Sequence, residues 1–446
     1  MKISLRDKFP ITLVFFWAIT SVLELVTYYN ARYLRLGILC VLLAEFLFVA
    51  SKRRFYKGKF AIGWLLSLVV VTYSVLHNLD ITNAEYLITY VFSVLLLIIP
   101  IYNFDNIAEQ ICKLVKIAAI FHGIGVIGQK IFPWFFNTFI YTRYPEEMYN
   151  RLSSATYHTG FQREVAVTSA YLIAGLGVFL YASKRKRSNT FWVIFLLLAL
   201  IITNKRAFIV FPILAIIVEM LIFQRAEGKI KTSRKRVLQI AAGIGIAMVA
   251  IVVFWSEISQ IPIVGRLMET ISALEAGEDA STGRNVLWAA SWQLFLTQPI
   301  LGIGWRNTET YIRLLVYSSV ELSTHNVYLQ LLTETGIIGA LIFGGAFIFS
   351  IKHFYKTYKR AHRFAKESDE RIAKVYFGLT RCATYYQVFF LLYCITGCNL
   401  QERAFMIFYF VSIFITKEID RNISNIEQLK ARDDENETIQ SRTTIG

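Results

Sequence analysis

Residues 190–223 read TFWVIFLLLALIITNKRAFIVFPILAIIVEMLIF, in which two apolar runs are separated only by Asn204-Lys205-Arg206. A helix that rises about 1.5 Å per residue needs roughly 20 apolar residues to cross the hydrocarbon core of a bilayer, and each run with its flanks approaches this length. Because that core contains no water, the backbone of each run must satisfy its own hydrogen bonds, which favours helices. The stretch therefore predicts two membrane-spanning helices joined by a short charged turn.

Similar apolar runs recur along almost the whole chain. Of its 446 residues, 55% are hydrophobic and only 17% are charged, and the mean hydropathy is +0.48. A soluble domain carries about 25% charged residues. The runs do not alternate polar and apolar residues, which excludes a β-barrel. The sequence predicts an all-α, polytopic bundle of about twelve spans with a partly helical outer loop. The spans are residues 11–29, 36–51, 60–76, 87–102, 114–131, 164–182, 190–203, 207–223, 237–255, 326–351, 375–397 and 404–416.

The net charge of +16 follows this topology. With the N-terminus inside, most of the 47 Lys and Arg residues fall in cytoplasmic segments, including Lys184-Arg185-Lys186-Arg187 and residues 352–374. This is the bias expected of a membrane protein, so we expect a lipid bilayer and no nucleic acid as partner. We divide the chain into a membrane domain, residues 1–416, and a polar, disordered cytoplasmic tail, residues 417–446. Both termini are expected in the cytoplasm.

Two long segments are expected on the outer face, residues 132–163 and 256–325. The first mixes tyrosines with Arg163 and other polar residues, which suits either sugar binding or an interfacial aromatic belt. The second contains an amphipathic stretch over 285–297 that Pro299 ends, and a glycine-bearing turn follows at Leu301-Gly302-Ile303-Gly304-Trp305. Asn326 then provides a helix cap for the tenth span.

Arg206 lies in a very short outer turn, against the preference of basic residues for the inside. A permanently charged guanidinium at that depth favours an anionic partner. The five cysteines form no C-x-x-C pair, and no histidine cluster suggests a metal site, so we expect neither a metal nor a cofactor.

Several motifs occur in order between residues 200 and 345. These are Thr203-Asn204-Lys205-Arg206 at the start of a span, Gly283-Arg284 with Trp288, Pro299 with Gly302-Ile303-Gly304, and His325-Asn326 followed by Glu334 and Gly336. On these residues the chain resembles the O-antigen ligase and Wzy-type polymerase family of bacterial polysaccharide assembly. It departs from the family at Lys205, where a serine is usual.

The resemblance implies glycosyl transfer on the outer face of the bacterial cytoplasmic membrane, from an undecaprenyl-diphosphate-linked oligosaccharide and without a metal. Arg206 and Arg284 would then bind the diphosphate, with Lys205, Asn326 and Arg163 as further donor contacts. Arginine suits this role because its planar fork bonds phosphate oxygens in pairs. A flippase and a chain-length regulator are the partners that such a function implies.

Two roles stay open for His325. As a general base it would take the proton of the acceptor hydroxyl, and as a protonated imidazolium it would bind phosphate. Structural interpretations also stay open: Arg206 as an interfacial anchor, Arg284 as a solvated loop charge and His325 as part of a helix cap. The joint occurrence of the three residues on one face favours the functional interpretation.

Among functions, the sequence favours a polymerase that joins lipid-linked repeat units. A ligase that transfers the finished chain to a lipid A-core or another terminal acceptor is the alternative. A flippase is less favoured, because transporters of this size place functional charges at mid-membrane in broken helices, often on a two-fold repeat. A scaffold protein would tolerate the loss of single outer arginines.

Overall fold

The computed structural model of the chain describes residues 58–76, 81–98, 104–153, 157–183, 187–227, 283–316, 323–368, 370–398 and 400–443. Every regular element in these residues is a helix. Three predicted spans, residues 11–29, 36–51 and 237–255, lie outside the described residues. The elements are α3 (Lys59–Leu76), α4 (Ile81–Ile98), α5 (Phe104–Ile131), α6 (Pro133–Phe135), η1 (Phe136–Ile140), η2 (Tyr141–Arg143), α7 (Glu146–Ser153), α8 (Val165–Gly177), η3 (Val178–Ala182), α9 (Arg187–Ile202), α10 (Ala207–Ala226), α14 (Arg284–Thr297), α15 (Thr308–Leu315), α16 (Val327–Glu367), α17 (Arg371–Tyr393) and α18 (Arg403–Thr443).

Five of the described helices are long and apolar enough to cross a membrane: α3, α5, α8 with its continuation η3, α10 and α16. Two shorter helical segments, Tyr86–Ile98 and Arg187–Ile202, are also apolar. The predicted all-α membrane bundle is therefore confirmed, whereas the count of about twelve spans is not. The apolar part of α18 ends before Lys417, and Arg381 and several polar residues interrupt α17, so these two helices are less apolar than the five.

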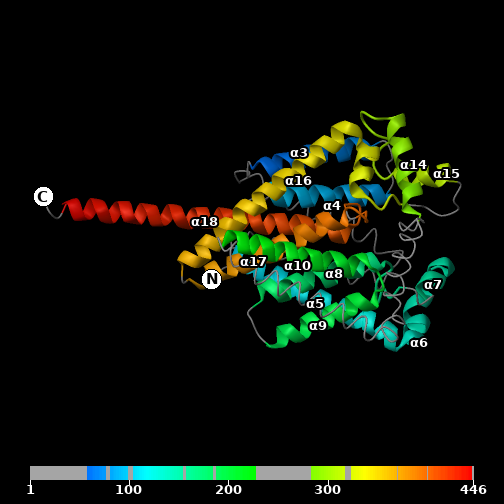
Figure 1. Ribbon diagram of the computed structural model, residues 1–446, viewed down its shortest axis with the longest axis horizontal. Coiled ribbons are helices and arrows are strands. Elements are labelled where there is room, and N and C mark those ends of the chain that lie inside the picture. The colour runs from blue at the N-terminus through cyan, green and yellow to red at the C-terminus, as the bar shows by residue number, and fades with distance from the viewer. Residues whose placement is uncertain are drawn as a thin grey trace.

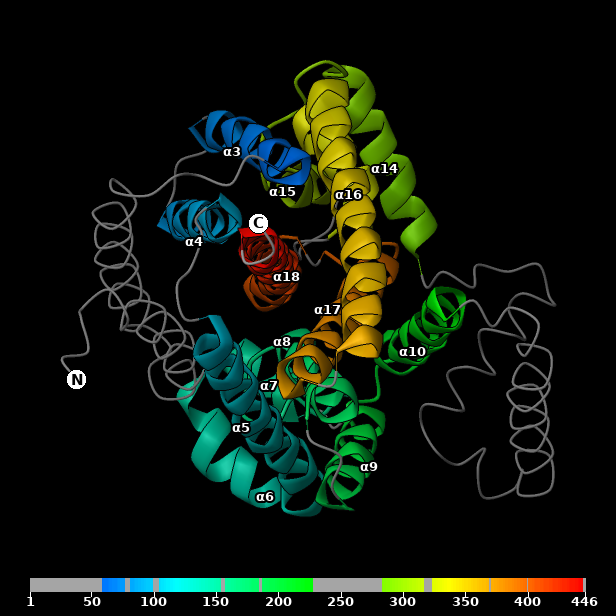
Figure 2. The same cartoon turned by 90° about the vertical axis from the view of Figure 1, so that its left-hand side faces the viewer.

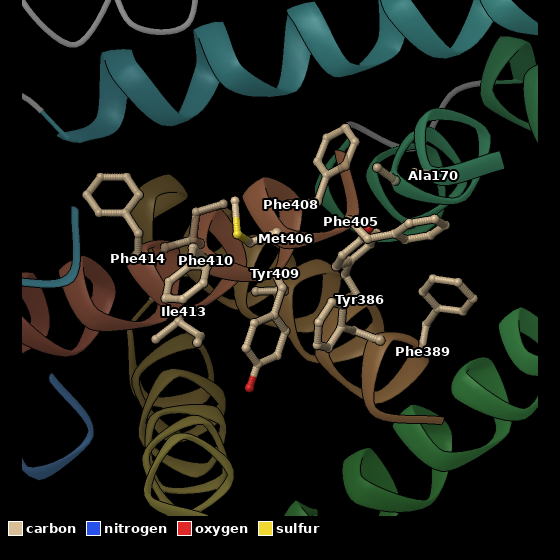
Figure 3. Packing of buried hydrophobic residues seen from close by; sticks show 14 of the residues in the cluster. Ala170, Tyr386, Phe389, Phe405, Met406, Phe408, Tyr409, Phe410, Ile413 and Phe414 are labelled. Atoms are coloured by element: carbon tan, nitrogen blue, oxygen red, sulfur yellow. The ribbon is translucent and has the colours of Figure 1, made fainter. Parts of the chain in front are cut away.

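Helix α18 lies at the centre of the bundle, where Figure 2 shows it nearly end-on. It packs against α4, α8, α16 and α17. The packing is dominated by aromatic side chains, several of which Figure 3 shows around α18. Tyr409 stacks on Phe390 of α17 with ring centroids 4.1 Å apart, and Phe408 meets the edge of Tyr171 of α8. Such aromatic pairs add stability beyond the area that they bury, so α18 is held on several sides at once.

The short helices gather at one end of the bundle, which we call the loop end. Figure 1 shows α6 and α7 below, α14 and α15 above, and the far end of α18 on the opposite side. The four short helices come from the two segments that the sequence predicts on the outer face. Helices α9 and α10 are joined by a short turn, as predicted, and α14 matches the predicted amphipathic stretch over 285–297.

The structure differs from the prediction at the tail. The sequence predicts a disordered tail from residue 417 onward. In the structure, α18 continues through this part of the chain as far as Thr443. Ion pairs to neighbouring helices hold the first part of this extension: Arg360 of α16 pairs with Asp420 at 2.9 Å and with Glu427, and Lys430 lies 3.5 Å from Glu370. Polar composition alone does not reveal these partners, because they lie on a different helix.

A buried ion pair connects α10, α16 and α17 away from the loop end. Arg381 donates two hydrogen bonds to Glu219, at 2.6 and 2.8 Å, and the Tyr358 hydroxyl donates to the same carboxylate at 2.7 Å. The guanidinium also lies over the Tyr181 ring, 4.6 Å from its centroid. The Glu219 side chain has no exposed surface, so water cannot stabilise its ionised carboxylate. The ionised form is therefore stabilised by these partners.

We expect Arg381→Met to destabilise the protein by about 3–5 kcal/mol, since it leaves the Glu219 carboxylate buried and unpaired. The double variant Arg381→Met with Glu219→Gln removes both charges and should recover most of that loss. The measurement is the unfolding of the purified protein in detergent for the two variants and the wild type. Equal stability of the single and double variants would contradict this account of the pair.

Candidate functional site

The α9–α10 turn carries the first two candidate residues. Thr203 donates its hydroxyl to the Leu200 carbonyl at 2.6 Å, and Asn204 has a φ of 57°, a left-handed conformation that asparagine tolerates better than most residues. The backbone of α10 then starts at once, with the Arg206 carbonyl accepting from Ile209 at 3.1 Å. The chain therefore reverses within a few residues and presents Lys205 and Arg206 together.

Lys205 is directed toward the end of α17. Its ammonium donates to the Tyr393 hydroxyl at 3.4 Å and lies 4.9 Å from the centroid of the Phe208 ring. Tyr393 itself is almost completely buried. The ammonium thus lies between an aromatic face of α10 and a phenol of α17, which fixes where its charge is presented.

Arg284 begins α14, directly after Gly283, which has a φ of 83°. Burial lowers the pKa of Arg284 below the usual arginine value, and the nearby positive charge of Arg206 lowers it further. Tyr393 and Tyr157 also lie close enough to act on this guanidinium. The two predicted arginines therefore lie in one place although they are far apart in sequence, and their mutual repulsion would be relieved by an anion.

Two polar contacts hold α14 against the segment that precedes His325. The Trp288 indole donates to the Thr324 carbonyl at 3.0 Å, and the Ser291 hydroxyl lies 3.2 Å from that of Thr324. The Thr333 hydroxyl of α16 donates to the Ser291 carbonyl at 3.1 Å. Because Trp288 lies one turn beyond Arg284, these bonds also fix the arginine relative to the start of α16.

His325 lies in a strained position immediately before α16. Its φ is 51°, in the left-handed region that a histidine rarely adopts. Asn326 caps the helix as predicted, with its side-chain oxygen accepting from the Leu329 amide at 3.1 Å. The Val327 amide donates to the Cys394 carbonyl at 2.8 Å and so joins the start of α16 to the end of α17.

The charge state of His325 follows from its surroundings. Burial lowers its pKa to about 4, and the positive charges of Arg284 and Lys205 contribute in the same direction. With a pKa near 4 the imidazole is neutral at pH 7 and keeps a free lone pair on one nitrogen. His325, Arg284 and Lys205 therefore share one electrostatic environment.

A break in α16 lies about three turns beyond His325. Gly336 has a φ of 64° and a ψ of −170°, which interrupts the helix. The turn after α14 fills the gap: the amides of Ile303 and Gly304 each donate to α16 carbonyls at 3.0 Å, and Ile337 donates to the Pro299 carbonyl at 2.9 Å. The predicted glycine-bearing turn is confirmed. It supplies hydrogen-bond partners for the backbone groups that the break in α16 leaves without partners in the helix.

The carboxylate of Glu334 lies at this break. It accepts from Gln330 at 3.1 Å and from Gln401 at 2.6 Å, and Gln330 also donates to Gln401 at 2.7 Å. Gln401 belongs to the turn between α17 and α18. The network therefore connects the start of α16 to that turn.

Arg163 forms an ion pair within its own segment of the chain. It lies before α8 and pairs with Glu164 at 3.8 Å, and Glu164 also pairs with Arg151 at 2.9 Å. From the same segment, Tyr157 interacts electrostatically with Arg284 and raises the pKa of its guanidinium. Hydrogen bonds of 2.8 Å from the Gly160 amide to Gln129 and 3.0 Å from Tyr141 to the Gly160 carbonyl hold this segment on α5.

Two residues near the cluster carry no signal in the sequence, Tyr393 and Glu402. Tyr393 reads as one of many aromatic residues in an apolar helix, and Glu402 reads as half of a local pair with Arg403. Both lie far along the chain from Lys205 and Arg284, and only the packing of α17 and α18 brings them to this end. In the part of the chain that the structure describes, no group of three His, Cys, Asp or Glu side chains could hold a metal ion.

The sequence of this region was compared with those of known proteins. Residues 191–344 match the family described as O-antigen ligase, a range that includes Lys205, Arg206, Arg284 and His325. No curated protein matches the chain. The match indicates a glycosyl-transfer type of enzyme and confirms the resemblance drawn from the motifs. The segment from residue 191 to residue 344 is therefore similar to the O-antigen ligase family.

Proposed function

We propose that the protein polymerises undecaprenyl-diphosphate-linked oligosaccharide repeat units on the outer face of the bacterial cytoplasmic membrane. The observation that carries the proposal is a cluster in which Arg284 and Lys205 lie near a neutral His325 and Arg206 lies near Arg284. The positive charges of the cluster repel one another, and a diphosphate would offset this repulsion. Its oxygens can accept charge-assisted hydrogen bonds from each of the cations.

In the proposed reaction the two arginines and Lys205 hold the donor diphosphate. The acceptor hydroxyl attacks the anomeric carbon while the bond from that carbon to the phosphate oxygen breaks, and the electron pair of the broken bond stays on the diphosphate. His325 takes the hydroxyl proton and later returns it to water. Burial and the neighbouring cations lower the pKa of His325 and keep its imidazole neutral in the empty site, which favours the base over a phosphate-binding imidazolium. The bound diphosphate would raise this pKa and so strengthen the base.

The leaving diphosphate gains negative charge as the bond breaks, so the cations that bind the donor also stabilise the transition state. We propose Asn326, which follows His325 in the chain, and Arg163 as further donor contacts. The proposed mechanism uses no metal, and activity of the purified protein with lipid-linked donor should persist in EDTA.

A ligase that transfers the finished chain to a lipid A-core or another terminal acceptor is the second candidate, and the description of the matching family favours it. Both reactions use the same donor chemistry and differ only in the acceptor. In either case a flippase would supply the donor, and a chain-length regulator would be a partner of the polymerase.

Deletion of the gene should separate the two candidates. Loss of a polymerase leaves single repeat units on the final acceptor, whereas loss of a ligase leaves long chains on the carrier lipid. The measurement is the length distribution of polysaccharide on the acceptor and on extracted undecaprenyl diphosphate. Long carrier-bound chains in the deletion strain would support the ligase function and contradict the polymerase function. Unchanged polysaccharide in the two fractions would contradict both functions.

A further inference from the structure

Helix α16 continues past its apolar part with basic residues on one face, which we call the basic stripe. Its five members are spaced four, three, four and three residues apart and are Lys352, Lys356, Lys359, Arg363 and Lys366. Residues three or four apart lie on the same side of an α-helix, so this spacing keeps all five together. All five side chains are exposed. The buried residues Phe354, Tyr358 and Ala361 lie on the opposite side of the helix.

The basic stripe carries charge that the described part of the chain does not neutralise. Arg360, which lies off the stripe, pairs with Asp420 and Glu427 of α18. Across the residues that the structure describes, by contrast, no carboxylate forms an ion pair with any member of the stripe. Glu367 follows the stripe at the end of α16 and is itself exposed. The stripe therefore fits an anionic partner.

The lipid-facing side of α16 leads directly into the stripe. Leu341 and Ile348 are 71% and 52% exposed although they belong to the apolar part of the helix. They are seven residues apart, and Ile348 precedes Lys352 by four, so the same line along the helix continues into the stripe. A Cβ atom added to Gly345, which lies on this line too, would meet no other atom within 4 Å. Because α16 is long and apolar enough to cross a membrane, this exposed line faces lipid chains.

The stripe starts where that line leaves the lipid chains, at the depth of the headgroups. From Lys352 the helix rises about 10 Å to Lys359 and about 21 Å to Lys366. The headgroup layer is roughly 5–7 Å thick on each side of a bilayer, and its charge acts over a further Debye length of about 8 Å. The first three cations are therefore within reach of the headgroups. The oblique course of α16 across the bundle brings the last two closer to them (Figure 1).

Two lysines of the stripe lie on aromatic rings. The Lys352 ammonium is 5.9 Å from the centroid of the Phe349 ring, and the Lys359 ammonium is 4.5 Å from that of Tyr355. Their aliphatic stems thus cover apolar surface while the charged ends stay exposed. This arrangement is typical of lysines at a membrane surface.

We infer that the basic stripe binds the headgroups of anionic phospholipids, in the leaflet at the end of the bundle opposite the loop end. The inference is independent of the proposed glycosyl transfer. An acidic protein would also complement the charge, but a bilayer places its headgroups directly beyond the lipid chains that Leu341 and Ile348 face. Phosphate oxygens accept charge-assisted hydrogen bonds from ammonium and guanidinium groups, and a net negative headgroup is favoured over a zwitterionic one.

The test uses the purified full-length chain in nanodiscs with equal amounts of phosphatidylglycerol and phosphatidylcholine. After extraction with a mild detergent, the lipids that stay bound to the protein are quantified. We expect the wild type to retain phosphatidylglycerol in preference. The triple variant Lys352→Gln, Lys356→Gln and Lys359→Gln should lower the ratio of the two lipids by about fivefold or more, because it removes the cations at headgroup depth. Higher salt should lower the wild-type ratio as well.

Two variants control the experiment. Arginine in place of the same three lysines keeps the charge and should keep the wild-type ratio. Lys430→Gln with Arg432→Gln removes two exposed cations from the extension of α18, away from the stripe, and should also leave the ratio unchanged. Size-exclusion profiles check that each variant is folded, which is expected because every changed side chain is exposed.

Three results would overturn the inference. The first is a wild type that retains the two lipids equally, which would leave an acidic protein as the partner that fits the stripe. The second is a triple glutamine variant that keeps the wild-type ratio. The third is an equal loss in the α18 control, because the ratio would then follow the net charge of the protein and not the stripe.

Discussion

Arg284→Ala is expected to abolish polymer formation while leaving the amount of protein in the membrane unchanged. If the guanidinium makes two charge-assisted bonds to the diphosphate, each contributing about 1.5–3 kcal/mol, its loss lowers the rate on the order of 10²–10⁴-fold. Stability should not suffer, because Arg284 is partly buried beside Arg206 and its pKa is lowered rather than raised. The readout is the polysaccharide ladder in a deletion strain that carries the variant gene, with the protein quantified in isolated membranes.

Three comparisons sharpen this prediction. Arg206→Ala should give the same loss, because both arginines serve one anion. Arg284→Lys should restore little activity, since lysine lacks the bidentate fork; near-normal polymer would mean that charge alone is sufficient. Arg313→Ala changes a basic residue in the last turn of α15 and should leave the ladder unchanged. If Arg284→Ala remained active, the proposal that Arg284 binds the donor diphosphate would be wrong.

The elements that the sequence predicts well are those with local signals. The turn at Asn204 is marked by charges between two apolar runs, and the start of α16 is marked by the Asn326 cap, which the structure contains. The helix over 284–297 is marked by a largely apolar stretch that begins after Gly283 and ends before Pro299. Because each candidate cation lies next to such a marker, its place at a helix end could be predicted without knowing how the helices pack.

The contacts between helices could not be predicted in this way. Tyr393 approaches Lys205 only because α17 packs beside α10, and hydrophobic periodicity does not specify which apolar helices are neighbours. Nor does the sequence indicate that Arg381 pairs with Glu219, which lies on another helix. The break at Gly336 was also missed, because a glycine within an apolar helix ordinarily fits the helix without interrupting it.

Gly336→Ala is expected to prevent accumulation of folded protein. The backbone at Gly336, with a φ of 64° and a ψ of −170°, belongs to a region that is essentially restricted to glycine. A Cβ atom there would lie 2.2 Å from the Ile300 carbonyl oxygen, which is backbone and cannot move aside. Relief of this clash would separate the turn from α16 and break the bond from Ile337 to Pro299. Backbone strain and the lost bond together should cost at least about 3 kcal/mol.

Gly344→Ala is the matched control, since it lies on the same helix and a Cβ atom there would meet no other atom within 4 Å. An alanine at an open helical position is expected to be neutral or stabilising by up to about 1 kcal/mol. Size-exclusion profiles and melting temperatures in detergent would compare the two variants. A Gly336→Ala protein that melts like Gly344→Ala would mean that the break is not required. If it does unfold, activity must be lost too, because the turn that fills the break connects Arg284 on α14 to the helix that begins after His325.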